Sequence, residues 1–331
     1  MKFLVIQTAF LGDVILATAV VEKLKQHFPD AHIDFFLRKG NEAVFENPGY
    51  PGLQEVLIYD KKQKKPANLF SLIKKVRAKK YDAVVNLNRF GSSGLLTCFS
   101  GAKEKIGFDK NPFSFCYTKK INHEIGTGKH ETERNQQLIA HLTDPFPAKP
   151  KLYPAKNDFE KAKSFLPSQS STASSYICIA PASVWHTKQF PKEKWTAMIE
   201  LLSNDLKIFL IGSKEDFQLC EEIKLKSKKE GMENLAGKMS VLQTAALMKN
   251  ARMNYVNDSA PLHIASAVNA PVTAAFCSTV PAFGFGPLSE NSKIVETSEK
   301  LSCRPCGLHG HSQCPEGHFK CAQTISVQEL L

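Results

Sequence analysis

The sequence predicts an α/β protein made of two doubly wound domains. Along both halves, apolar segments of strand length alternate with segments of helical periodicity. Strands that alternate with helices form parallel sheets with right-handed crossovers. A Pro-rich segment at 144–154 divides the halves, and 331 residues suffice for about two domains of ~150 residues. We therefore predict domains at 1–155 and 156–331.

Each expected element follows from its hydrophobic pattern. In the first half we expect strands at 2–7, 32–37, 55–59 and 82–87, with helices at 14–28 and within the basic stretch 61–80. In the second half we expect strands at 176–182, 206–212, 253–257 and 271–276, and helices at 158–166, 192–203, 214–228, 240–249 and 261–268.

Composition places the chain among ordinary globular proteins. Hydrophobic residues make up 43% and charged residues 23%, which excludes a disordered or fibrous protein. No apolar run approaches the ~18 residues of a membrane-spanning helix. The first residues, MKFLVIQTAFLGD, lack the length and cleavage site of a signal peptide, so we expect a cytoplasmic protein.

The net charge of +11 is concentrated in one segment. Residues 61–80 hold nine basic residues and no acid, which leaves +2 for all the rest. Such a patch attracts anionic lipid or a phosphorylated substrate, whereas the commoner interpretation is a solvated helix face. Nothing resembles a nucleic-acid-binding motif, so we expect no nucleic-acid partner. The candidate acceptor and membrane residues are Lys61, Lys62, Lys64, Lys65, Lys74, Lys75, Arg77, Lys79 and Lys80.

Ligands of doubly wound sheets bind beyond the carboxyl ends of strands, so the loops there are the candidate sites. The chain has neither the G-x-G-x-x-G of dehydrogenases nor a P-loop. Asp13 follows the first strand; it is either a helix N-cap or a carboxylate able to take a proton from a hydroxyl.

Three loops of the second half have similar alternatives. Lys188 is either a surface lysine or a cation for a departing diphosphate. The segment 257–263, NDSAPLH, either caps a helix or presents its N–H groups to a phosphate. An acid in the segment 212–216, GSKED, either caps a helix or binds a ribose diol.

Together these loops resemble glycosyltransferase family 9, the ADP-heptose:lipopolysaccharide heptosyltransferases. The matching segments are colinear and cover most of the chain: FLVIQTAFLGDVILATAVVEKLKQHFPDAHIDFF, GAKEKIGF, IAPASVWHTKQFPKEKW, FLIGSKED, LAGKMSVLQTAALMKNARMNYVNDSAPLHIASAVNAPVTAAF and FGP. The resemblance implies a GT-B fold, in which two Rossmann-like domains face each other across a cleft. It also implies an inverting transfer of heptose that needs no metal cofactor, with the acceptor on the first domain and the nucleotide sugar on the second.

The resemblance also implies roles for single residues. Asp13 matches the general base and Lys188 the lysine on the diphosphate. Glu215 or Asp216 matches the acid on the ribose, beside Gly212, and Met239 matches the residue beside the adenine. Ser-Ala stands where many members of the family have Thr-Gly. The remaining donor-site positions are Ser183, Thr187, Asp258, Ser259, Ala260 and His263. The implied partners are a nucleotide-sugar donor and an anionic lipid-linked glycan at the inner face of the cytoplasmic membrane.

Nine cysteines fall into two sets. Cys98, Cys116, Cys178, Cys220 and Cys277 are scattered, and we expect them to be buried thiols. The cysteine-rich tail, residues 303–321, holds Cys303, Cys306, Cys314 and Cys321. Four thiols with one CxxC pair can bind structural zinc, but the second pair lacks the spacing of a zinc ribbon, which favours free or redox-active thiols.

Three other functions compete with a heptosyltransferase. The first is an enzyme of the same fold with another nucleotide sugar or glycan acceptor, since a fold does not fix a substrate. The others are a non-catalytic binder of sugar nucleotides or anionic lipid, and a nucleic-acid-binding protein.

Overall fold

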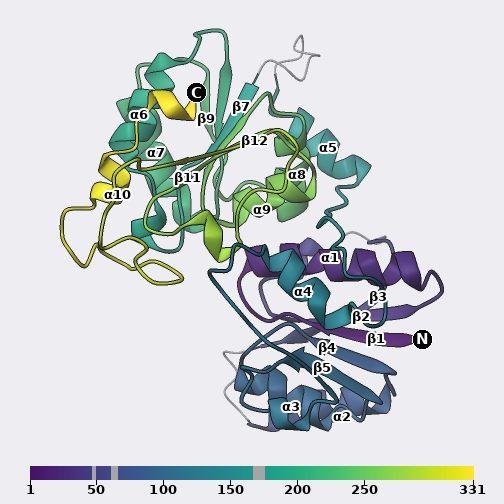
Figure 1. The fold of residues 1–331 in the computed structure, drawn as a ribbon. Helices are drawn as coiled ribbons and strands as arrows, with labels where there is room; N and C mark the ends of the chain where they lie inside the picture. Colours follow the sequence, from purple (N-terminus) through teal and green to yellow (C-terminus); the bar gives the residue numbers. More distant parts are fainter. Residues whose placement is uncertain (47–49, 61–65, 167–175) are drawn as a thin grey trace. The chain divides into compact units, whose positions relative to one another are not determined.

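The computed structural model describes residues 1–46, 50–60, 66–166 and 176–331. The chain forms two compact units, Met1–Leu152 and Tyr153–Leu331. Each unit contains one six-stranded parallel sheet with helices on both faces (Figure 1). This confirms the predicted α/β class with two parallel sheets. Within the described ranges, no helix has the length and apolar character needed to cross a membrane.

The first sheet has the strand order β3-β2-β1-β4-β5-β6. Helices α1 and α4 cover one face, and α2 and α3 cover the other (Figure 1). Its strands are β1 (Lys2–Ile6), β2 (His32–Arg38), β3 (Leu53–Tyr59), β4 (Ala83–Asn86), β5 (Glu104–Phe108) and β6 (Lys119–Ile121). Its helices are α1 (Leu11–His27), α2 (Pro66–Ala78), α3 (Gly91–Phe99) and α4 (Glu131–Ile139).

The second sheet repeats this topology, with the order β12-β11-β10-β7-β8-β9. Its strands are β7 (Tyr176–Ala180), β8 (Lys207–Leu210), β9 (Met232–Asn234), β10 (Asn254–Asn257), β11 (Val272–Phe276) and β12 (Ser292–Glu296). Its helices are α5 (Lys156–Lys163), α6 (Lys192–Leu201), α7 (Phe217–Lys226), α8 (Val241–Lys249), α9 (Ala260–Ala267) and α10 (Lys320–Gln323).

The topology creates one switch point in each unit. The chain leaves β1 toward one side of the first sheet and β4 toward the other, and β7 and β10 are related in the same way. A crevice forms where neighbouring strands diverge like this, outside their carboxyl ends. Strands β1 and β7 are held in place by burial. In β1, the side chains of Phe3, Leu4, Val5 and Ile6 are inaccessible to solvent, and β7 is buried throughout. The loops after β1, β4, β7 and β10 are therefore held by rigid elements.

The expectation that Cys98 and Cys116 are buried thiols was wrong. Cys98 and Cys116 form a disulfide instead of remaining free thiols, because the loop after β5 returns to the end of α3. Cys178, Cys220 and Cys277 are free and buried, as predicted.

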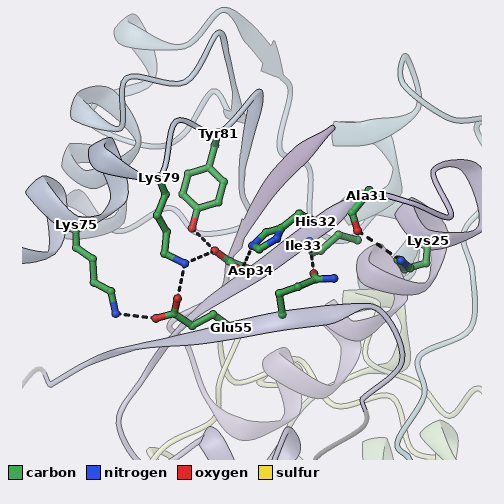
Figure 2. Close-up of polar contacts among 10 residues, drawn as sticks. Lys25, Ala31, His32, Ile33, Asp34, Glu55, Lys75, Lys79 and Tyr81 are labelled. Carbon is green, nitrogen blue, oxygen red and sulfur yellow. Dashed lines mark hydrogen bonds and ion pairs between the residues drawn. The ribbon is translucent and has the colours of Figure 1, made fainter.

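Part of the predicted basic patch is neutralised by acids of the sheet. Lys75 pairs with Glu55 at 2.7 Å, and Lys79 binds both Glu55 and Asp34 (Figure 2). These two lysines are therefore not free cations of a membrane surface, because β2 and β3 carry acids next to α2. Lys74, Arg77 and Lys80 are exposed, whereas Lys61, Lys62, Lys64 and Lys65 lie outside the described residues.

Asp34 is the centre of this ion-pair cluster and is fully buried. Its carboxylate accepts hydrogen bonds from Lys79 Nζ at 2.7 Å and from the Tyr81 hydroxyl at 2.5 Å (Figure 2). Burial acts to lower the pKa of Lys79, but its bonds to Asp34 and Glu55 raise that pKa overall. Lys79 therefore stays charged at neutral pH and compensates the buried carboxylate.

Lys75 and Lys79 both bind Glu55, but only Lys79 also binds the buried Asp34. We therefore expect their replacement to affect stability differently. Lys79→Met removes the lysine that pairs with buried Asp34 and leaves its carboxylate with only the His32 and Tyr81 bonds, so we expect unfolding to become easier by about 3 kcal/mol. The control Lys75→Met removes a side chain that is 53% exposed, and it should cost less than about 1 kcal/mol. Urea denaturation of both variants checks this, and equal midpoints would contradict it.

Candidate active site

Asp13 lies in the first turn of α1, immediately beyond the carboxyl end of β1. The helix begins three residues earlier than predicted, so Phe10 is the N-cap and Asp13 occupies the third helical position. Its carboxylate accepts the Phe10 N–H at 3.1 Å. The interpretation of Asp13 as an N-cap was therefore wrong in position, although its carboxylate does bind the N-cap backbone. The positive end of the helix dipole favours its ionised form.

A second acid lies close enough to Asp13 for their charges to interact. Glu131, at the start of α4, is 7% exposed and accepts two hydrogen bonds from Arg134, at 3.0 and 2.7 Å. Burial raises the pKa of Glu131, the positive charge of Arg134 opposes the rise, and the negative charge of Asp13 adds to it. Asp13 therefore stands at the edge of a charged network rather than alone.

The charges of two arginines, Arg89 and Arg134, act on both Glu131 and His123. Burial and the charges of Arg89 and Arg134 lower the pKa of His123 to about 4, so His123 is neutral at pH 7. Arg89 is exposed in the loop after β4, at the switch point of the first sheet. Sequence reasoning missed Arg89, Glu131 and Arg134. The rule about carboxyl ends of strands would have found Arg89, because its strand was predicted.

In the second unit, Lys188 and Asp258 meet across the switch point. Lys188 closes a short 3-10 turn, η4 (His186–Lys188), after β7, and Asp258 follows β10. Lys188 Nζ lies 2.7 Å from Asp258 Oδ2, with the two side chains 16% and 6% exposed. The Thr279 hydroxyl donates to the same carboxylate oxygen at 2.6 Å. A cation is thus fixed where the topology places a ligand.

Asn257 fixes the loop that carries Lys188. Its side chain is fully buried, and its Oδ1 accepts the Phe190 N–H at 2.8 Å. Its Nδ2 donates to the Pro181 carbonyl at 2.8 Å. One amide of β10 therefore holds both ends of the loop between β7 and α6. Asn257 was predicted as part of a loop, but this role was not.

The other predicted donor residues border the same end of the sheet. Ser259 is the N-cap of α9, yet its hydroxyl donates to the Asn257 carbonyl instead of accepting a capping bond. Ala260 is the first residue of α9, and His263 is buried in its first turn. Ser183 is half-buried, and Thr187 is 1% exposed.

In the loop after β8, Glu215 and Asp216 differ in their surroundings. Asp216 accepts the Ser213 N–H at 2.7 Å and its hydroxyl at 2.8 Å, so this acid caps the turn η5 (Lys214–Asp216). Glu215 is exposed. Gly212 accepts the Gly237 N–H at 3.0 Å, which brings the loop of half-buried Met239 beside this turn.

The four tail cysteines lie in loops before and within α10. Burial raises the pKa of Cys306, and that of Cys321 to about 11; the other tail thiols add to both shifts. Over the described ranges, no three His, Cys, Asp or Glu side chains are placed to hold a metal ion. All four are free cysteines, and structural zinc stays the less favoured of the two alternatives that the sequence left open.

Known proteins are similar to this chain in sequence and in fold. The model of the family described as "Glycosyltransferase family 9 (heptosyltransferase)" matches residues 69–318. Lipopolysaccharide heptosyltransferase 3 of Escherichia coli is 30% identical over 292 residues, which cover 85% of each protein. The chain belongs to glycosyltransferase family 9. It is therefore a glycosyltransferase, as the sequence resemblance predicted.

Solved structures agree with this assignment at the level of the fold. A family 9 glycosyltransferase from Veillonella parvula has a TM-score of 0.84 at 22% identity, and the match covers 99% of this chain and 94% of that one. The Escherichia coli ADP-heptose lipopolysaccharide heptosyltransferase II has a TM-score of 0.79 at 20% identity, over 100% and 96% of the two chains. Over almost the whole chain, the fold therefore matches that of these two solved structures.

The role of Asn257 as a brace gives a stability prediction. Asn257→Ala leaves the Phe190 N–H without its acceptor inside the protein, which should lower the free energy of unfolding by about 1–3 kcal/mol. Asn204→Ala is the control, because Asn204 is exposed and should change stability by less than ~0.5 kcal/mol. Thermal and urea unfolding of both variants would contradict this role if Asn257→Ala were as stable as the control.

Proposed function

We propose that this glycosyltransferase moves a heptose from ADP-heptose to the anionic inner core of lipopolysaccharide, with inversion at the anomeric carbon. The observation that carries the proposal is the Lys188–Asp258 pair at the switch point of the second unit. The family and the names of its relatives supply the sugar and the acceptor. The GT-B arrangement of the two units is part of the proposal.

The donor would bind at the carboxyl ends of β7, β8 and β10. Lys188, with the N–H groups at the start of α9, would hold the diphosphate, because a fixed cation and a helix N-terminus both favour phosphate. Exposed Glu215 would bind the ribose diol, since Asp216 is already engaged in its cap. Met239 would lie beside the adenine.

The acceptor hydroxyl would attack the anomeric carbon as its bond to ADP breaks. Asp13 would take the proton of that hydroxyl, and the new glycosidic bond would form on the face opposite the leaving group. Lys188 would stabilise the negative charge that develops on the departing ADP. In this proposal no metal is required, and Asp258 keeps Lys188 oriented toward the phosphates.

Asp13→Asn tests the assignment of the base. The amide keeps an oxygen that can accept the Phe10 N–H, but it cannot take a proton. We expect kcat to fall by about 10²–10⁴-fold with unchanged affinity for ADP. The measurement is ADP release from ADP-heptose with a lipid-linked acceptor.

The chain provides a matched control for this variant. Asp158 occupies the same third helical position in α5 and binds its N-cap N–H at 2.8 Å. Asp158→Asn therefore repeats the structural change away from the proposed site and should retain full activity. Transfer by Asp13→Asn at the rate of the Asp158→Asn control would rule out Asp13 as the base.

We also propose that the first unit binds anionic membrane through the exposed basic residues of α2 and the turn after it. Lys74, Arg77 and Lys80 are exposed, and no carboxylate pairs with them among the residues that the structure describes. Each basic residue near an anionic surface contributes roughly 1 kcal/mol. An acceptor embedded in the inner leaflet would require such an attachment.

Sedimentation with phosphatidylglycerol vesicles tests the membrane proposal. Changing Lys74, Arg77 and Lys80 together to Ala should weaken vesicle binding at least about tenfold. The control changes Lys156, Lys161 and Lys163 of α5 to Ala, which removes the same charge from the other unit. Equal binding by the two triple variants would contradict the membrane proposal and would indicate that this face of α2 is only solvated.

A further inference from the structure

The cysteine-rich tail packs directly on the turn that carries Lys188. The Thr187 N–H donates to the His311 carbonyl at 3.1 Å, and the His311 N–H donates to the Thr187 hydroxyl at 2.7 Å. The Ser278 hydroxyl, after β11, also bonds to the Thr187 hydroxyl, at 3.1 Å. Thr187 is 1% exposed, so these bonds are shielded from water. The tail thus fixes the residue next to Lys188.

Gly310 lies next to the turn that carries Lys188. Its φ of +76° lies in the left-handed region that favours glycine. A Cβ at this position would lie 2.9 Å from the Thr187 hydroxyl oxygen and 3.1 Å from Lys188 Cγ. A methyl group there would force at least one neighbour to shift: the Thr187 hydroxyl, the Lys188 stem, or the Ser278 hydroxyl, whose oxygen would also lie 3.1 Å from the Cβ.

The same tail is anchored beside the partner of Lys188. The Arg304 guanidinium donates to the carbonyls of Cys277 at 2.7 Å and Thr279 at 2.8 Å. Arg304 also pairs with Glu296 at 2.6 Å, and its side chain is only 10% exposed. Thr279 in turn donates to Asp258. Both members of the Lys188–Asp258 pair are therefore supported by the tail.

We propose that the cysteine-rich tail is a positioning element of the donor site, and that Gly310 sets the place of Lys188 through direct contact with the turn. This inference rests on the proposed function, in which Lys188 binds the donor diphosphate. A tail with no functional role would need only to cover the end of β11. The hydrogen bonds of the tail instead converge on Thr187, the neighbour of Lys188, and a side chain at Gly310 would meet the Lys188 stem.

Gly310→Ala tests this role in the full chain. We expect the Kd for ADP, measured by titration calorimetry, to rise at least tenfold while the protein stays folded. Gly307→Ala and Gly317→Ala are matched controls, because both tail glycines have positive φ, +69° and +70°, yet a Cβ would meet no atom within 4 Å. They carry the same backbone strain without the contact and should change the Kd less than twofold.

A double-mutant cycle separates positioning of Lys188 from general destabilisation. If Gly310 acts through Lys188, adding Gly310→Ala to Lys188→Ala should weaken ADP binding by less than twofold beyond Lys188→Ala alone. Should Gly310→Ala fail to fold, Thr187→Val removes the hydroxyl that binds His311 while keeping the size of the side chain. It should also raise the Kd at least tenfold.

Three results would overturn the inference. Gly310→Ala could bind ADP as tightly as the Gly307→Ala and Gly317→Ala controls, its effect could multiply with that of Lys188→Ala, or a folded Thr187→Val could bind ADP normally. These outcomes leave the proposed function intact, because the unmodified protein still binds ADP. An unmodified protein that binds no ADP would overturn both the proposed function and this inference.

Discussion

The ion pair between Lys188 and Asp258 is the interaction on which the account of this protein depends. Both side chains are largely buried, and their charges are close enough to compensate each other. The pair stands where the strand order of the second sheet reverses, which is where ligands of doubly wound sheets bind. In the proposed function, this cation holds the diphosphate of the nucleotide sugar.

The rest of the second unit supports that pair from three directions. Asn257 of β10 holds both ends of the loop that carries Lys188, and Thr279 after β11 holds the carboxylate of Asp258. Gly310 of the tail limits the space around the lysine stem. A side chain held on rigid strands loses little freedom when it meets a ligand, so these contacts would favour binding of the proposed donor.

The sequence predicted the buried centre of each sheet better than its edges. Strands β1 and β7 were found because KFLVI and YICIA are nearly continuous apolar segments. Strands β5, β6, β9 and β12 were missed, since EKIGF, KKI, MEN and SKIVE are polar or short. Their pairing with a buried neighbour, rather than their own pattern, makes them strands.

Residues of the candidate site were predicted where they lie in a loop directly after a strand. Residues that reach the site through contacts distant in sequence were missed. Asp13, Lys188 and Asp258 follow strands whose patterns are clear. Glu131 reaches the surroundings of Asp13 from α4, and Gly310 reaches Thr187 across more than a hundred residues. No periodicity or spacing indicates such pairs, because only the folded sheet brings them together. The disulfide of Cys98 and Cys116 was missed for the same reason.

A crystal structure of the protein with ADP would test the central claim most directly. The account predicts that the β-phosphate lies within hydrogen-bonding distance of Lys188 Nζ, at the start of α9. ADP bound elsewhere, with the Lys188–Asp258 pair left undisturbed and away from any phosphate, would contradict it.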